Sequence, residues 1–336
     1  MGNVVATRCI VAKNRQGFRM VGIGALPARF RRPRLLIVGC GDVGQRVSRV
    51  VPSSAAYASS AWQVMALTST PERVPALRAM GVRPLIGNLD DLASLQRLAG
   101  VATHVLHLAP PNPDGDVDRR TRALVRALGR RSRPIKLVYG STTGVYGDCG
   151  GAWVNECASL APGTARAHRR VSAETSIKRF ARCFGVPYTV LRIPGIYAPD
   201  RAGGTPKQRL ERKTPVLVPE ADVFTNHIHA DDLARACWLA LVGRASYAAV
   251  NVTDDSDMRM SQYMDFAAAV YQLEKPPRMT LEQIQAHLTP MALSFMQESR
   301  RLVNTRMKTR LGLQLRYPTV REGLTQIPQP FHPSHR

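Results

Sequence analysis

The sequence predicts an α/β protein with a doubly wound parallel sheet and a smaller, mostly helical C-terminal part. Between residues 34 and 140, short apolar segments rich in Val, Ile and Leu alternate with segments of helical periodicity. Strands that are joined in this way by helices form parallel sheets. The first apolar segment also ends in a glycine-rich turn that precedes a helical segment. This order of strand, turn and helix is typical of a dinucleotide-binding unit.

The chain is strongly basic but otherwise has the composition of a globular protein. Its 336 residues include 47 Lys and Arg against 24 Asp and Glu, and 44% of them are hydrophobic. Residues 1–33 are basic, contain no acid and show no periodicity, which predicts a disordered extension. A basic arm can contact nucleic acid, but no helix-turn-helix, zinc-finger or aromatic-stacking pattern accompanies it. We therefore expect no nucleic-acid partner.

The cysteines and the hydropathy pattern bear on location and metal binding. The six cysteines are scattered without CxxC spacing, and no Cys/His cluster has the spacing of a zinc site. Reduced thiols fit a cytoplasmic protein. No apolar run reaches the ~18 residues that a membrane span needs. The sequence therefore predicts a cytoplasmic protein with no metal site and no membrane association.

A GxGxxG turn follows the apolar segment 35–38. The turn and the start of the next helix contain Gly39, Gly41, Asp42, Val43 and Gly44. In such a turn the first glycine permits the sharp bend, the second lets the backbone approach a pyrophosphate, and the third lets the helix pack on the strand. The N-terminus of the helix then faces the phosphates with free N–H groups. These residues predict a Rossmann-type cofactor site.

The end of the second predicted strand, 63–68, bears on the choice of cofactor. Enzymes that use NAD usually place an acidic residue there to bind the ribose 2′-hydroxyl. This chain instead has hydroxyl side chains from Thr68 onward and then Arg73, with no carboxylate at the strand tip. These groups suit a 2′-phosphate, so the sequence favours NADP over NAD.

The alternation of strands and helices continues to residue 139. Strands are predicted at 83–86, 104–108 and 135–139, and helices at 74–80, 92–98 and 119–129. Two strand ends contribute further candidates for the adenine and ribose sites, namely Asn88, Leu89, Ala109 and Pro110. Ligands of doubly wound sheets bind beyond such strand ends. Ordinary loop residues are the equal alternative for these four positions.

The C-terminal part is predicted to be helical and to cover the substrate. Helices are expected at 261–273, 281–302 and 318–323. The resulting domains are a cofactor domain at 34–195 to which 225–255 return, a substrate-binding part at 196–224 and 256–325, and a loose tail at 326–336. Basic residues at 300–310 suit an anionic substrate group, with a solvated helix end as the alternative.

Three motifs resemble the extended short-chain dehydrogenase/reductase family, which includes sugar-nucleotide epimerases. They are Gly140–Gly147 (GSTTGVYG), Leu191–Tyr197 (LRIPGIY) and His227–Ala234 (HIHADDLA). The resemblance covers residues 34–255. It implies that Thr142, or Ser141 in reserve, hydrogen-bonds the reacting oxygen of the substrate, and that Pro194 flanks the nicotinamide. It also implies a homodimer.

The resemblance fails at the residues that carry catalysis. Members of the family have Tyr-x-x-x-Lys on the helix after this strand, whereas this chain has Arg166 and Arg170 at those two positions. Arg170 can still donate hydrogen bonds to ribose hydroxyls. Arg166 cannot act as a general acid or base, because a guanidinium group keeps its proton at any working pH. The sequence thus resembles an atypical member of the family.

Three hypotheses follow for the chemistry. In the first, another group supplies the proton, and the candidates are His168, His227, His229, Tyr146 and Tyr197. In the second, Thr142 and Arg166 polarise a carbonyl while the cofactor delivers hydride. These two favour an NAD(P)-dependent oxidoreductase or epimerase/dehydratase-like enzyme for a small carbonyl, hydroxyl or sugar-nucleotide substrate. In the third, the protein is a catalytically inactive NADP-binding sensor or regulatory scaffold.

Overall fold

A computed structural model describes residues 32–51, 62–201, 203, 205–243, 246, 248–286, 293 and 296–326. The described residues from Pro33 onward form one compact unit. The predicted disordered extension at 1–33 and the predicted tail at 326–336 lie almost wholly outside the described residues.

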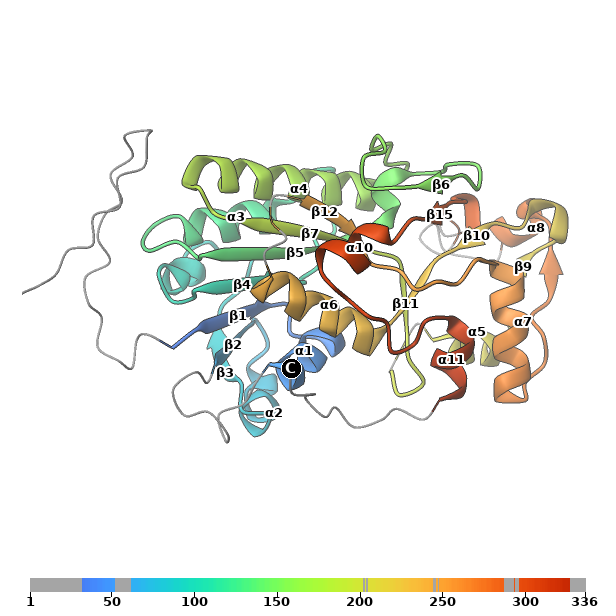
Figure 1. The fold of residues 1–336 in the computed structure, drawn as a ribbon, viewed down its shortest axis with the longest axis horizontal. Helices are drawn as coiled ribbons and strands as arrows, with labels where there is room; N and C mark the ends of the chain where they lie inside the picture. Colours follow the sequence, from blue (N-terminus) through green and yellow to red (C-terminus); the bar gives the residue numbers. More distant parts are fainter. Residues whose placement is uncertain are drawn as a thin grey trace, which may run out of the picture. The chain divides into compact units, whose positions relative to one another are not determined.

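Seven parallel strands form the central sheet, in the order β12-β7-β5-β4-β1-β2-β3 (Figure 1). These strands are β1 (Arg34–Val38), β2 (Gln63–Thr68), β3 (Arg83–Ile86), β4 (His104–His107), β5 (Lys136–Thr142), β7 (Tyr188–Ile193) and β12 (Ala248–Asn251). The chain reverses its direction of travel across the sheet at β1, which pairs with β2 on one side and β4 on the other. This topology confirms the predicted fold class and places a ligand crevice at the ends of β1 and β4.

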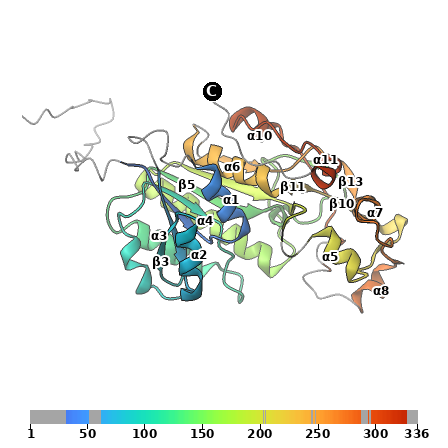
Figure 2. The same cartoon turned by 90° about the horizontal axis from the view of Figure 1, so that it is seen from below.

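Helices cover both faces of the sheet (Figures 1 and 2). The α-helices are α1 (Asp42–Val50), α2 (Val74–Ala79), α3 (Arg119–Leu128), α4 (Ala165–Phe184), α5 (Pro206–Glu211), α6 (Ala230–Val242), α7 (Met260–Tyr271), α8 (Leu281–Gln285), α10 (Thr305–Arg310) and α11 (Val320–Thr325). Short 3₁₀ helices are η2 (Pro71–Arg73), η3 (Ser94–Leu98), η4 (Thr143–Tyr146) and η5 (Pro219–Ala221).

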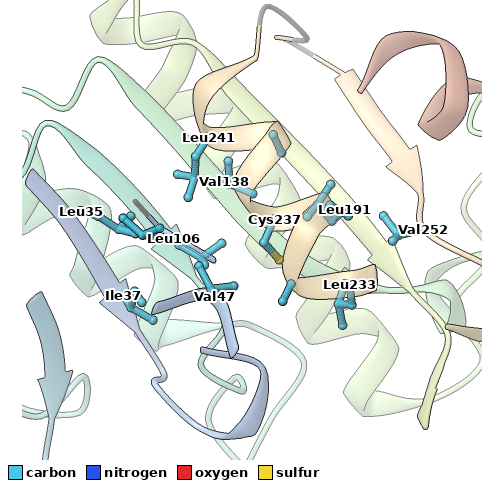
Figure 3. Close-up of a cluster of buried hydrophobic side chains, with 14 of the residues drawn as sticks. Leu35, Ile37, Val47, Leu106, Val138, Leu191, Leu233, Cys237, Leu241 and Val252 are labelled. Carbon is cyan, nitrogen blue, oxygen red and sulfur yellow. The ribbon is translucent and has the colours of Figure 1, made fainter. Parts of the chain in front are cut away.

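The sheet has a hydrophobic core on each face. On one face, Leu35 and Ile37 of β1 pack with residues of α1 and α6, a cluster drawn in Figure 3. On the other face, Leu36 and Val38 pack with residues of η3, α3 and α4. A strand covered on both faces has apolar side chains at successive positions. This explains why β1 appears in the sequence as an uninterrupted apolar run.

The C-terminal elements form a separate core beyond one end of the sheet (Figure 2). Side chains from α5, α7, α8 and α11 build this core. Four two-stranded pairs brace the same region, and they are β6 (Trp153–Val154) with β15 (Arg301–Leu302), β8 (Gly195–Tyr197) with β11 (His227–His229), β9 (Val216–Leu217) with β14 (Arg278–Met279), and β10 (Phe224–Thr225) with β13 (Met258–Arg259). None of the described helices combines the length and hydropathy that a bilayer span requires.

Two helix predictions were wrong. The single helix predicted at 281–302 is interrupted, because α8 ends at Gln285 and residues 301–302 form strand β15. The amide of Arg301 donates to the carbonyl of Ala152 at 2.9 Å, a pairing across 149 residues that local periodicity does not reveal. The helix predicted at 92–98 is the 3₁₀ helix η3, which begins only at Ser94. The Ser94 hydroxyl bonds the carbonyls of Asn88 and Asp91, which favours the turn over an earlier helix start.

A buried histidine in β4 predicts acid sensitivity. Burial and then the charge of Arg170 lower the pKa of His107 to about 3. Because burial disfavours the charged imidazole, the unfolded state binds more protons at His107 than the folded state below pH ~6.5. The stability of the protein is therefore highest above that pH and falls as the pH falls. We expect the free energy of unfolding to drop by about 2 kcal/mol between pH 7 and pH 5 from His107 alone. Urea unfolding should measure this drop, and His107→Gln should reduce it; equal slopes in both proteins would contradict the assignment.

Candidate active site

The turn between β1 and α1 requires glycine at its first position. Gly39 has a φ of +88°, in the region that favours glycine. A Cβ atom at this position would lie 2.3 Å from the backbone nitrogen of Ala109, which follows β4. The ends of β1 and β4 therefore approach each other more closely than any side chain at Gly39 would allow.

The other two glycines of the turn differ in their surroundings. A Cβ atom on Gly41 would have no neighbour within 4 Å, whereas one on Gly44 would lie 3.2 Å from the carbonyl oxygen of Gly39 and from Cγ2 of Ile37. Gly44 thus allows close packing of α1 on β1. Gly41 faces open space at the N-terminus of α1, where the first-turn N–H groups, including that of Val43, have no acceptor within the helix. This arrangement suits the pyrophosphate of a dinucleotide.

An ion-pair network holds the first turn of α1 in place. The carboxylate of Asp42 accepts from Arg46 Nε at 3.0 Å and from Arg201 Nε at 2.8 Å. The buried Arg46 also donates to Asp200 at 2.8 Å and to Asp231 at 2.5 Å. Asp42 therefore faces these arginines, and its charge is balanced beside the glycine-rich turn. No local pattern in the sequence identifies this network, because its hydrogen bonds join residues that are up to 185 positions apart.

The tip of β2 places a cation against the glycine-rich turn. Arg73 Nη2 donates to the carbonyl oxygen of Cys40 at 2.6 Å. Burial raises the pKa of the Cys40 thiol to about 11, and the charge of Arg73 partly opposes this shift. Thr68 is buried, and its hydroxyl bonds the backbone of Thr70. Of the two side chains predicted from this strand end, Arg73 thus contacts the turn and Thr68 shapes its own loop.

The candidates after β3 and β4 have local roles in the structure. The side chain of Asn88 accepts from the amide of Asp90, and Leu89 packs against the core. Ala109 is buried beside Gly39, and the carbonyl of Pro110 accepts a long hydrogen bond from Arg120 at 3.4 Å. Ala109 is therefore the member of this group that the structure brings to the glycine-rich turn.

The end of β5 carries two hydroxyl groups with different surroundings. Ser141 is buried and donates to Glu174 Oε1 at 2.7 Å. Thr142 is only half-buried, and its hydroxyl oxygen accepts from the amide of Gly144 at 3.3 Å, which caps η4. Since the Thr142 oxygen serves as an acceptor there, its proton is free to bind another oxygen. Thr142 is thus better placed than Ser141 to contact a substrate.

Glu174 connects this strand end to the rest of the sheet. Arg192 of β7 donates to both of its oxygens, from Nη2 at 2.9 Å and Nε at 3.2 Å. Arg192 also donates to the hydroxyl of Tyr146 at 2.8 Å, and that hydroxyl donates to Asn251 at 2.7 Å. Burial lowers the pKa of Arg192, but the hydrogen bonds and charge of Glu174 raise it by more. The network joins α4, β5, β7, η4 and β12.

The two arginines that replace the family's Tyr and Lys lie on consecutive turns at the start of α4. Arg170 is buried and donates to Tyr139 Oη at 3.0 Å and to the carbonyl of Gly140 at 2.9 Å. Arg166 is exposed over the residue as a whole. Partial desolvation of its guanidinium group, and to a smaller extent the charges of Arg170 and Arg169, lower its pKa. The start of α4 therefore carries concentrated positive charge close to the end of β5.

Four of the five alternative proton donors are buried. Burial raises the pKa of Tyr146 and of Tyr197, and it lowers the pKa of His227 to about 3 and that of His229 as well. Tyr146 belongs to the Glu174 network, and the Tyr197 hydroxyl donates to the carbonyl of Thr319 at 3.2 Å. His168 is exposed. None of the buried four is an obvious replacement for the missing tyrosine.

The carboxylate of Glu298 approaches Gly144, the residue whose amide donates to Thr142. A Cβ atom on Gly144 would lie 3.8 Å from Glu298 Oε2 and from Thr142 Oγ1, and one on Gly163 would lie 3.8 Å from Glu298 Oε1. Arg300 holds Glu298 through an ion pair of 2.9 Å and also donates to the carbonyl of Gly147. No local signal in the sequence places Glu298 at this site, because Gly144 and Gly163 lie more than 100 residues earlier.

Pro194 joins β7 to β8, and β8 pairs with β11 from Gly195 to Tyr197. Pro194 is half-buried at the end of the strand next to β5. The role of Pro194 beside the nicotinamide stays a prediction. No group of acidic, histidine and cysteine side chains within the described ranges has the arrangement of a metal site.

The glycine-rich turn, the open N-terminus of α1 and the doubly wound sheet together define a dinucleotide-binding α/β protein. The family model described as NAD dependent epimerase/dehydratase matches residues 36–252. The chain belongs to the NAD-dependent epimerase/dehydratase family. This finding confirms the resemblance to the extended short-chain dehydrogenase/reductase family. No curated protein matches the sequence.

Solved structures share the fold over most of the chain. A functionally unknown conserved protein from Silicibacter pomeroyi is 30% identical, with a TM-score of 0.70 over 87% of this chain and 97% of that one. UDP-glucose 4-epimerase from Thermotoga maritima, solved with UDP-glucose, is 18% identical, with a TM-score of 0.68 over 87% and 96%. UDP-glucuronic acid 4-epimerase from Bacillus cereus, solved with NAD, is 16% identical, with a TM-score of 0.66 over 87% and 94%. At these identities, the two epimerases show the fold alone.

Proposed function

We propose that the protein is an NADP-dependent enzyme that oxidises, reduces or epimerises a hydroxyl- or carbonyl-bearing substrate of the sugar-nucleotide type. The observation that carries the proposal is the turn at Gly39–Gly44, which leaves open space at Gly41 before the uncapped N-terminus of α1. This turn lies one strand away from β4 and two from β5, which ends in Thr142. The cytoplasmic location and the homodimer that the resemblance implies belong to the same proposal.

Arg73 supports NADP as the cofactor. Its guanidinium group contacts the carbonyl of Cys40 inside the glycine-rich turn, at the end of the strand that contacts the adenosine ribose in such folds. Guanidinium groups bind phosphates with paired hydrogen bonds. The tip of β2 carries no carboxylate before Glu72 that would compete with a 2′-phosphate.

Replacing Arg73 should therefore change cofactor preference. In Arg73→Gln, we expect the NADPH dissociation constant to rise by roughly 10- to 100-fold, because a charge-assisted hydrogen bond is worth about 1.5–3 kcal/mol. The NADH dissociation constant should change by less than about 3-fold. Fluorescence titration measures both, with Arg78→Gln of the neighbouring helix as a control of equal charge. An equal loss of affinity for the two cofactors would contradict the assignment of Arg73.

The chemistry is proposed to depend on charge rather than on a tyrosine. When bound, the nicotinamide supplies or accepts the hydride. The Thr142 hydroxyl donates to the substrate oxygen, and Arg166 stabilises the negative charge that develops on it. In the direction of reduction, that oxygen then takes its proton from solvent or from another nearby group. Arg170 keeps the start of α4 against β5 through its bonds to Tyr139 and Gly140.

A test of this chemistry uses NADPH with a panel of UDP-sugars, small aldehydes and ketones. For any compound that is turned over, Arg166→Ala should lower kcat/KM by roughly 10²- to 10³-fold, as does the loss of one oxyanion donor. Arg166→Lys should retain part of the rate because it retains the charge. An unchanged kcat/KM in Arg166→Ala would contradict the role of Arg166. Tight NADPH binding without turnover of any compound would favour the inactive sensor or scaffold.

A further inference from the structure

The end of the sheet opposite the cofactor turn is strongly basic. In a doubly wound parallel sheet each helix leads back to the start of the next strand, so α2, η3, α3 and α4 all end beside the strand starts (Figure 1). The connections from these helices to the next strands, residues 80–82, 99–103, 129–135 and 185–187, contain no acidic residue. Exposed arginines gather at this end of the molecule, here called the basic end, and they are Arg78, Arg83, Arg97, Arg126, Arg130, Arg131, Arg133 and Arg182.

Helix stabilisation accounts for only some of these arginines. A cation in the last turn is favourable, because the C-terminal end of a helix carries partial negative charge. This explains the arginines in the last turns of α2, η3, α3 and α4, which are Arg78, Arg97, Arg126 and Arg182. By contrast, Arg130, Arg131 and Arg133 lie beyond Gly129, the C-cap of α3. The concentration of positive charge therefore exceeds what the helices need.

Side-chain contacts bring the ends of α3 and α4 together. A Cβ atom on Gly129 would lie 3.2 Å from Cε2 of Phe184, the last residue of α4. The guanidinium carbon of Arg133 lies 4.5 Å from the centroid of the same ring. Arg126 and Arg182 are in the last turns of these two helices. Arginines from two helices and from the loop before β5 thus share one surface.

Exposed apolar side chains lie at the same end. Ile135, Phe184 and Val242 are 61%, 41% and 45% exposed, respectively. Ile135 immediately precedes β5, and Val242 is the last residue of α6, which leads into β12. A hydrogen bond of 2.7 Å from Lys136 Nζ to Ser246 Oγ connects the chain after α6 to the start of β5. Apolar side chains flanked by cations suit the boundary between lipid headgroups and acyl chains.

We propose that the basic end docks on the surface of a bilayer that contains anionic phospholipids. The arginines pair with headgroup phosphates, and Ile135, Phe184 and Val242 enter the boundary between headgroups and acyl chains. Surface docking needs no spanning segment, whereas the expectation of no membrane association rested on the absence of one. The docking surface is independent of the proposed function, because the cofactor turn follows the other end of β1.

The apolar side chains favour a bilayer over nucleic acid as the partner. Proteins that bind single strands stack bases on aromatic rings, but at the basic end the guanidinium group of Arg133 already lies over the ring of Phe184. Protein–DNA interfaces are polar, so Ile135 and Val242 would gain little there. A bilayer takes up both the charges and the apolar side chains.

The test is sedimentation of the full-length protein with lipid vesicles. One set of vesicles contains phosphatidylcholine with about one third phosphatidylglycerol, which makes the surface anionic, and the other contains phosphatidylcholine alone. Wild type should bind the anionic vesicles at least about 10-fold more tightly at low ionic strength, and this preference should shrink as salt screens the arginines. Neither kind of vesicle should change the NADPH dissociation constant.

Variants with equal loss of charge separate the basic end from net charge. In the triple variant Arg126→Gln, Arg130→Gln and Arg182→Gln, the dissociation constant for anionic vesicles should rise about 100-fold, since each arginine near an anionic surface contributes a factor of about 5. The matched control should lose less than about 5-fold, because it replaces exposed arginines away from this end, and it combines Arg119→Gln, Arg212→Gln and Arg321→Gln. All variants retain residues 1–33, so the difference between the two triples reports the basic end alone.

Ile135→Gln tests the apolar contact. It should weaken binding to anionic vesicles several-fold, and the loss should persist at high salt because its origin is hydrophobic. All the substituted side chains are exposed, so Tm should stay within a few degrees of the wild type in every variant.

The outcomes are distinct for the docking surface and for the proposed function. Absence of binding to anionic vesicles, equal binding to both kinds of vesicle, or an equal loss in the two triple variants would overturn the docking surface. Tighter binding to a duplex oligonucleotide than to anionic vesicles, lost in the first triple variant, would assign the basic end to nucleic acid instead. Failure to bind NADPH, with vesicle binding that depends on the basic end, would contradict the proposed function and leave the docking surface standing.

Discussion

Glu174→Ala should lower the free energy of unfolding by about 3–5 kcal/mol, the cost of removing one partner from a buried ion pair. Glu174 is 1% exposed and receives hydrogen bonds from Arg192 and Ser141. Its loss leaves the buried Arg192 without a counter-charge and the Ser141 hydroxyl without an acceptor. Urea unfolding at pH 7 measures the loss directly.

Two variants define the limits of this prediction. Glu174→Gln keeps the shape and some of the acceptors, so its loss should be smaller than that of Glu174→Ala. Lys178→Ala removes the other cation near Glu174, at 3.9 Å and 43% exposed, and should cost less than about 1 kcal/mol. A loss below about 1 kcal/mol in Glu174→Ala would show that the network does not hold the end of β5.

Gly39→Ala should cost roughly 3 kcal/mol or more of stability, through left-handed backbone strain together with overpacking. The positive φ of Gly39 disfavours alanine, and the new methyl group would lie 2.3 Å from the backbone nitrogen of Ala109. The ends of β1 and β4 would have to separate, so cofactor affinity should also fall. Thermal unfolding and NADPH titration measure the two effects.

Gly41→Ala is the matched variant, because it should affect binding alone. Gly41 has a φ of −78°, and an added Cβ atom would meet nothing within 4 Å. Its stability should therefore remain within about 0.5 kcal/mol of the wild type. NADPH affinity should fall by at least about 10-fold, since the methyl group would occupy space assigned to the pyrophosphate. Normal NADPH binding by Gly41→Ala would contradict the assignment of the pyrophosphate to this turn.

Much of the fold was predictable because its determinants are local. The strands β2 and β3 have the bounds that the sequence predicts, since each is a short segment rich in apolar residues that ends at a turn of polar residues or glycine. The GxGxxG turn was equally predictable, because the positive φ of Gly39 and the close packing of Gly44 on Ile37 are requirements within a few residues. The order and spacing of the family motifs identified Thr142 and the two arginines of α4 as candidates. This order and spacing are retained even where the residues differ from the family pattern.

The remaining features depend on contacts between distant residues. Strand β15 forms only because residues 301–302 meet residues 153–154, and Glu298 approaches Gly144 through the same pairing. The family resemblance places Thr142 before Ser141, but the physical reason lies in Glu174, which is 33 residues away from Ser141 and accepts its hydroxyl proton.

The most direct test of the central claim is a fluorescence titration of the purified wild-type protein with NADPH and with NADH. The account predicts tight, saturable NADPH binding and NADH binding that is at least about 10-fold weaker, given the phosphate contact assigned to Arg73. Tighter binding of NADH would contradict the role of Arg73 while leaving the turn at Gly39–Gly44 as the cofactor site. Binding of neither cofactor would contradict the account as a whole.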